Sequence, residues 1–219
     1  MGSLCWDVEQ GSITPGIHTT LVGLVEHHAD AAAIGIDMPI GLSDTGTRRC
    51  DVEARRVLGS KRASSVFPPP IHDILHIATH SEAVEMSRAK IGKGVSIFTF
   101  SIFPKIAEAN SAVTPEIQNR VFEVHPEVSF WALAGVPMLH RKSRQEGFDE
   151  RKVLLEEATG LSLPTRDEAF GLARPAKPDD ILDAVAAAWS AKRVVDGIAG
   201  RLPKEPETDS TGLRMEIVY

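Results

Sequence analysis

The pattern of apolar positions along the chain predicts an α/β fold. Two short apolar runs, 32–36 and 121–124, each end at a turn or a proline, which is typical of buried strands. A third run, 215–219, alternates between apolar and polar residues and predicts an edge strand. Helical patterns separate these runs, and no linker divides the sequence. We therefore expect a single domain over residues 1–219.

Apolar residues at helical spacing predict several helices, and the last of them has the clearest pattern. The predicted helices span 18–28, 51–59, 80–89, 104–113, 149–159 and 179–198. We expect Gly59 to end the second helix. The last helix is rich in alanine and follows Pro178, with Asp179 as its expected N-cap. We expect a turn at 12–16 and a polar tail after Pro203.

A carboxylate follows the first predicted strand. Asp37 comes directly after the run 32–36. In α/β folds, ligands and catalytic groups gather at the carboxyl ends of the strands, so Asp37 is a candidate site residue. The alternative is a turn residue whose side chain bonds its own backbone before a proline.

Three polar residues alternate after the second predicted strand. Glu123, His125 and Glu127 would share one face if the extended backbone continued through Pro126. The alternative is that Glu123 pairs with an arginine and that Glu127 begins the next helix.

The last predicted helix opens with acidic residues. Asp180 and Asp183 are three residues apart and therefore lie on one helix face. Asp179 and Asp180 have an alternative role as first-turn caps. Asp183 lies in an otherwise apolar segment, where a carboxylate is costly unless it is paired or bound to a cation. Carboxylate oxygens suit Mg²⁺ and Mn²⁺, which support phosphoryl chemistry.

Charge narrows the choice of partners. The net charge of −6 argues against a dedicated nucleic-acid binder. Basic residues nevertheless cluster at 48–62 and at 141–144, and these clusters are candidate phosphate contacts. The alternative is that they are solvated helix faces. The sequence contains no nucleotide-binding glycine motif and no GxSxG motif.

Bulk composition is that of a soluble protein. Hydrophobic residues make up 42% of the chain, and no apolar run is long enough for a membrane span. We find no signal peptide, and the two cysteines make no disulfide framework. We therefore expect a cytoplasmic protein.

Several motifs, in this order, resemble the DUF429 family of predicted RNase H-like nucleases. They are IDMPIGL (36–42), RRCDVEARRVLG (48–59), SSVFPPP (64–70), the PKI segment at 104–106, FEVHPEVSF (122–130), DDILDAVAAAW (179–189) and the ending GLRMEIVY. The resemblance covers about residues 34–219.

This resemblance implies an RNase H-like fold, with a mixed central sheet flanked by helices on both faces, and a nuclease that depends on Mg²⁺ or Mn²⁺. Matching motifs give Asp37 the role of the fourth-strand acid and Asp180 and Asp183 the roles of the late-helix acids. The implied catalytic set is Asp37, Glu123, His125, Asp180 and Asp183, of which His125 orients a ligand or water. The implied metal ligands are Asp37, Glu123 and Asp183. Beside them, basic residues supply the candidate phosphate contacts, for which we take Arg48, Arg49, Arg55 and Lys105.

One feature departs from the family pattern. The family usually opens with a strand reading GVDG, followed by Gly-Trp. Trp6 takes the place of that tryptophan, and Asp7 is not equivalent to the strand aspartate. Either the start of the chain is truncated or misassigned relative to the family, or the protein has lost an essential metal ligand, which would impair a nuclease. Loss of the strand would expose sheet edges, so we expect lowered stability. Two other functions fit the sequence: a non-catalytic module that binds nucleic acid or another partner, and a hydrolase of a small phosphorylated metabolite.

Overall fold

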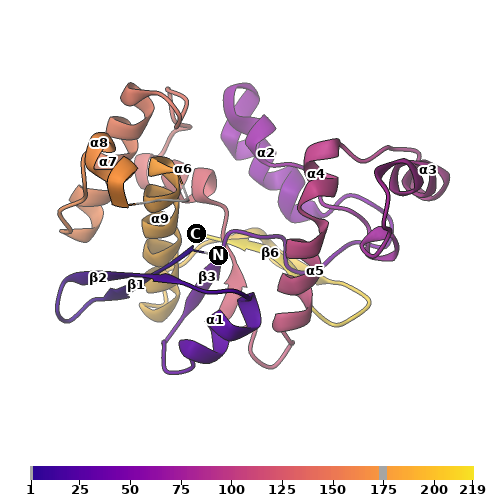
Figure 1. The fold of residues 1–219 in the computed structure, drawn as a ribbon, viewed down its shortest axis with the longest axis horizontal. Helices are drawn as coiled ribbons and strands as arrows, with labels where there is room; N and C mark the ends of the chain where they lie inside the picture. Colours follow the sequence, from indigo (N-terminus) through magenta and orange to yellow (C-terminus); the bar gives the residue numbers. More distant parts are fainter. Residues whose placement is uncertain (1, 173–176) are drawn as a thin grey trace.

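The computed structural model describes residues 2–172 and 177–219, and it confirms the α/β class (Figure 1). The strands are β1 (Gly2–Asp7), β2 (Ser12–Ile17), β3 (Ile34–Ile36), β4 (Val121–Glu123), β5 (Arg201–Thr208) and β6 (Arg214–Val218). The α-helices are α1 (Leu21–His27), α2 (Arg49–Arg62), α3 (His80–Ile91), α4 (Ile97–Ser101), α5 (Phe103–Ala112), α6 (Pro126–Ala134), α7 (Gln145–Thr159), α8 (Arg166–Leu172) and α9 (Pro178–Val195). Two short 3₁₀ helices, Ala63–Ser65 and His72–Ile74, follow α2.

Strands β3 to β6 form the centre of the molecule. β3 pairs with β4 in parallel, and β5 pairs with β6 antiparallel. A parallel bridge between Val124 and Val218 joins the two pairs, which gives the order β3-β4-β6-β5. The last strand was expected at the edge, and that expectation is wrong, because β6 lies between β4 and β5. The polar composition of residues 201–208 hid the strand β5 that covers its other side.

The N-terminal segment forms a hairpin of its own. Strand β2 pairs antiparallel with β1, so the predicted turn at 12–16 is wrong. The turn lies earlier, and Gly11 supports it with a positive φ of 61°. Pro15 is tolerated in β2, which pairs on one side only among the described strands. One face of the hairpin packs against an apolar cluster that includes Leu182 and Val185 of α9. This face carries Leu4, Trp6 and Ile13.

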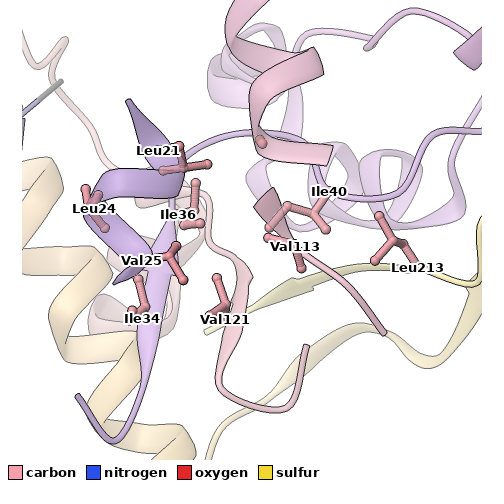
Figure 2. Close-up of a cluster of buried hydrophobic side chains, with 10 residues drawn as sticks. Leu21, Leu24, Val25, Ile34, Ile36, Ile40, Val113, Val121 and Leu213 are labelled. Carbon is pink, nitrogen blue, oxygen red and sulfur yellow. The ribbon is translucent and has the colours of Figure 1, made fainter. Parts of the chain in front are cut away.

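Helices cover both faces of the central strands. On one face, α9 packs on β3, and Phe122 and Val124 contact its alanines. On the other face, α1 and α5 cover β3 and β4 through the cluster drawn in Figure 2. Its labelled members are Leu21, Leu24, Val25, Ile34, Ile36, Ile40, Val113, Val121 and Leu213. Helix α2 packs on β5 and β6, where its apolar residues contact Met215 and Ile217.

Helix α9 approaches β3 unusually closely. A Cβ atom on Gly35 would lie 3.0 Å from the carbonyl oxygen of Ala187 and 2.8 Å from a methyl group of Val124. Glycine on the strand and alanine on the helix therefore bring the two backbones together. This close contact sets the position of α9 relative to the end of β3.

The predicted helices are present, with changes at their ends. Gly59 has non-helical backbone angles, with a φ of 62°, so the first helical segment of α2 ends there as expected and a second short segment continues to Arg62. Helix α9 starts at Pro178 with Lys177 as its N-cap, so the expected N-cap at Asp179 is wrong. The Asp180 carboxylate instead accepts a bond from the Lys177 N–H at 2.8 Å, which completes a capping box. Among the helices that the structure describes, none is both long and apolar enough to cross a membrane.

Candidate functional site

The end of β3 and the start of α9 meet at one point of the molecule. Asp37 lies two residues beyond Gly35, which is about 6–7 Å along an extended strand. Asp183 lies four residues before Ala187, which is about 6 Å along a helix. Because Gly35 contacts Ala187, these matching steps bring the two carboxylates near each other. Asp37 accordingly raises the pKa of Asp183.

Three aspartates of α9 form a compact acidic group at this point. One carboxylate oxygen from each of Asp179, Asp180 and Asp183 lies within 4.8 Å of the others. Asp180 and Asp183 were predicted site residues, whereas Asp179 was expected only as a cap. Asp179 and Asp183 are four residues apart, and this spacing could have placed Asp179 on the same helix face.

A lysine from a distant loop completes the group. Lys142 Nζ lies 2.5 Å from Asp183 Oδ2 and 3.5 Å from Asp179 Oδ2. Burial alone would lower the pKa of Lys142, but the carboxylates of Asp183, Asp179 and Asp37 outweigh it and raise that pKa. The sequence predicted Lys142 only as part of a basic cluster for phosphate. In the structure its ammonium group pairs with two of the α9 carboxylates.

The loop that carries Lys142 is held firmly against α7. Glu150 accepts bonds from the N–H groups of Leu139 and His140 at 2.7 and 3.0 Å. Arg151, which is fully buried, donates to the carbonyl oxygens of His140 and Gly147. A Cβ on Gly147 would lie 2.0 Å from the Arg141 carbonyl oxygen, so only glycine fits there. Lys142 is therefore delivered to the acids from a fixed backbone.

The environment shifts the pKa values of the two central acids upward. Burial raises the pKa of Asp183 to about 7, Lys142 opposes the shift, and Asp37 adds to it. Asp37 reaches solvent, yet the protein around its carboxylate displaces much of its water and so raises its pKa. The positive charges of His125 and Lys142 oppose this increase, and the carboxylate of Asp180 adds to it. The short contact to Lys142 favours charged Asp183, and the loss of water favours the neutral acid. The ion pair is thus complete only above neutral pH.

His125 lies within electrostatic reach of Asp37. Its Nε2 is 3.3 Å from the carbonyl oxygen of Ser65. Its buried Nδ1 has no hydrogen-bond partner within the described part of the chain. The ring therefore has one nitrogen fixed by the backbone after α2 and one nitrogen unused.

Glu123 does not join the α9 acids. Both of its oxygens accept bonds from Arg48, at 2.7 and 2.8 Å, and one also accepts the Ile40 N–H at 2.8 Å. The extended backbone does not continue through Pro126, because α6 begins there, and Glu127 instead pairs with Arg151 at 2.5 Å. The geometry is that of the alternative interpretation, in which Glu123 pairs with an arginine and Glu127 starts a helix.

The predicted phosphate contacts are dispersed. Arg48 is 1% exposed and also binds Asp51 at 2.6 Å, so its guanidinium group is enclosed. Arg49 pairs with Glu53 on the surface of α2. Arg55 donates to the carbonyl oxygen of Val66, at 2.6 and 2.8 Å. Lys105 lies exposed on α5.

Comparison with known proteins assigns the family. The sequence profile described as "Protein of unknown function (DUF429)" matches residues 2–208, which is most of the chain. The protein therefore belongs to the DUF429 family. No curated protein and no solved structure gives a significant match. The match begins at residue 2 and thus includes the hairpin, and the expectation of a missing first strand stays a prediction.

Replacement of Arg48 tests its structural role. Arg48→Met leaves Glu123 and Asp51 buried without their cation, so we expect a loss of about 3–5 kcal/mol in the free energy of unfolding. Arg49→Met is the matched control, because it removes an exposed pair worth about 1 kcal/mol or less. Urea denaturation measures both variants. Equal stabilities would contradict the structural role of Arg48.

The raised pKa of Asp183 predicts a pH dependence of stability. The folded protein binds more protons than the unfolded chain between about pH 4 and 7. This contribution to stability is complete below the unfolded pKa and is lost as pH rises through about 7. The stability of the wild type relative to Asp183→Asn should therefore fall with pH, by at most about 1.4 kcal/mol per unit. Denaturation curves for the two proteins that differ by a constant amount from pH 4 to 8 would contradict it.

Proposed function

We propose that the protein is a phosphodiesterase of the nuclease type, dependent on Mg²⁺ or Mn²⁺, whose site is formed by Asp37 and the acids of α9. Under this proposal Asp37, Asp179, Asp180 and Asp183 bind the cation. We extend the predicted metal set by Asp179 and Asp180 and remove Glu123 from it, since Arg48 and Ile40 occupy the oxygens of Glu123.

The observation that carries the proposal is the nearness of Asp37 to Asp183 and Asp180. These carboxylates come from a strand end and a helix start that are far apart in the sequence, and Asp180 raises the pKa of Asp37 while Asp37 raises that of Asp183. Gathering carboxylates in a partly dehydrated place raises the free energy of the folded state unless a cation neutralises them. An all-oxygen donor set of this kind fits Mg²⁺ and Mn²⁺.

Each residue has a task in this proposal. The bound ion would activate a water molecule and stabilise the leaving oxygen of a phosphodiester. Asp37 and Asp183 supply the ligands fixed by the contact between β3 and α9, and Asp180 shares its carboxylate between the ion and the α9 cap. His125, with Nε2 on the Ser65 carbonyl, orients water beside Asp37. Lys142 leaves Asp183 when the ion enters and offers its charge to a phosphate.

The RNase H-like fold belongs to the same proposal. The pairing of β3 with β4, the mixed arrangement of β3 to β6 and the helices on both faces support it. The placement of an acid-bearing late helix against the strand that carries Asp37 supports it as well.

A non-catalytic binding module is the second candidate, and Lys142 favours it. Its ammonium group already pairs with Asp183 and Asp179, at 2.5 and 3.5 Å, so these acids have a cation built into the chain. Replacement of Lys142 by methionine separates the two candidates. If the acids bind a metal ion, removing the competing ammonium group raises the affinity for Mn²⁺. If the acids serve only to anchor Lys142, the variant loses stability and gains no affinity.

A small phosphorylated substrate is the third candidate. Arg48, Arg49 and Arg55 are engaged by protein groups, so they do not form a continuous basic track along which a polymer could bind. A nucleotide or sugar phosphate needs no such track. Hydrolysis of such a small substrate would use the same acidic residues, and it is measured together with the hydrolysis of DNA and RNA.

A calorimetric titration with Mn²⁺ tests the proposal. We expect the wild type to bind Mn²⁺ and both Asp37→Asn and Asp183→Asn to weaken binding by roughly tenfold or more, because each removes a charged ligand. Asp196→Asn is the matched control, since Asp196 lies exposed at the other end of α9 and pairs with Lys192.

The same proteins are then incubated with Mn²⁺ and a panel of DNA, RNA, hybrid duplexes, branched junctions and nucleotides. The proposal predicts cleavage that Asp183→Asn abolishes and Asp196→Asn retains. Mn²⁺ binding that is equal in the wild type, Asp37→Asn and Asp183→Asn would refute the metal site, as would no binding at all. Binding without turnover on any substrate would favour the non-catalytic module.

A further inference from the structure

A second group of metal-binding side chains lies on the N-terminal hairpin and α1. Three histidine rings lie in mutual contact, those of His18, His27 and His28. The ring centroids are 5.3 Å apart for His18 and His27, 5.4 Å for His18 and His28, and 4.8 Å for His27 and His28. They line a cavity of about 260 Å³ together with Ser3 and Cys5. The cavity is separate from the residues of the acidic site.

The hairpin has two chemically different faces, and this explains the cavity. Leu4 and Trp6 turn to the apolar cluster beneath α9. Ser3 and Cys5 alternate with them and therefore face the histidines. A Cβ on Gly16, which pairs with Ser3, would lie 3.2 Å from His18 Nε2, so the absence of a side chain there leaves room for the ring.

The spacing of the rings matches that of ligands on one ion. An imidazole nitrogen binds Zn²⁺ at about 2.0–2.1 Å, so the centres of two rings on a tetrahedral ion lie roughly 5 Å apart. The observed separations agree with that value. The interplanar angles of 56°, 67° and 89° exclude a parallel stack, which would turn the ring edges away from a common point.

The rings need a small rearrangement before they can share an ion. Their nitrogens are more widely spaced than those of a preformed site, and His18 Nε2 lies 3.0 Å from Ser3 Oγ. His27 is exposed and the other two rings are half-buried, and His18 has to give up its contact with Ser3 Oγ to bind an ion through Nε2. Burial, followed by His27 and His28, lowers the pKa of His18, which favours the neutral imidazole that binds metals.

We propose that His18, His27 and His28 form a binding site for a divalent transition-metal ion of the Zn²⁺ class. Three imidazoles prefer such ions to Mg²⁺, which takes oxygen ligands. The fourth position faces the cavity, where water and the Cys5 thiol are at hand. An ion held there ties the hairpin to α1, because His18 follows β2 and the other two histidines end α1.

Calorimetric titration with Zn²⁺, in the presence of excess Mg²⁺ to fill the acidic site, tests this inference. We expect one Zn²⁺ per chain. His18→Gln and His27→Gln should each reduce the affinity for Zn²⁺ at least about tenfold, because even a change in a residue that only hydrogen-bonds to a metal ligand lowers affinity by that much. His76→Gln is the matched control, because His76 is exposed and lies outside the group. Asp183→Asn should bind Zn²⁺ as the wild type does, which separates this site from the acidic one.

Thermal melting gives a second readout. Without metal, the three histidine variants should melt as the wild type does, and Asp183→Asn is compared with its own metal-free melting temperature. Added Zn²⁺ should raise the melting temperature of the wild type and His76→Gln but not of His18→Gln or His27→Gln. The inference is overturned if Zn²⁺ binds equally to His18→Gln, His27→Gln and the wild type, or if the wild type does not bind it.

Discussion

The close contact between Gly35 and Ala187 determines the arrangement on which the candidate site depends. With no side chain on the strand and only methyl groups on the helix, α9 lies against β3 at backbone distance. Two residues along the strand and one turn along the helix then lead to Asp37 and Asp183. A larger residue at 35 would push the helix outward and separate the carboxylates. The chemistry of the site is therefore a consequence of close packing one turn away from it.

Repulsion between these acids is the cost of that arrangement, and the chain offsets it locally. Lys142 supplies a positive charge from a loop that Glu150 and Arg151 fix to α7. The result is a site in which one ammonium group offsets part of the acidic charge, and a divalent cation that binds Asp183 has to displace it. Arg48 plays a comparable part for Glu123 and Asp51, but it is enclosed and has no such exchange open to it.

The sequence predicted much of the fold and part of the site, for reasons that particular residues illustrate. Apolar runs located β3 and β4, and the alanine-rich pattern with the carboxylates at its start predicted helix α9. Residues 12–17 and 201–208 were missed as strands because prolines and polar side chains interrupt their alternation. Strand order was also beyond reach, since the bridge between Val124 and Val218 depends on contacts distant in sequence.

Among the candidate residues, Asp180 and Asp183 lie in the acidic group of α9 with Asp37 within electrostatic reach, while Glu123 lies with Arg48. The difference lies in partners that local spacing does not reveal. An acidic residue at the end of a strand can bind a metal ion or accept hydrogen bonds from a buried arginine. The sequence does not reveal which, because Arg48 is far from Glu123 along the chain. Lys142 was equally hidden, because a basic loop residue gives no signal of the acid that it will meet.

The most direct test of the account is a crystal structure of the protein soaked in Mn²⁺, with the ion located by its anomalous scattering. The account predicts a peak bounded by the carboxylates of Asp37 and Asp183, with Lys142 moved away from Asp183. Well-ordered carboxylates with Lys142 still bonded to Asp183, and no anomalous peak between them, would contradict the claim that strand end and helix start form a cation site.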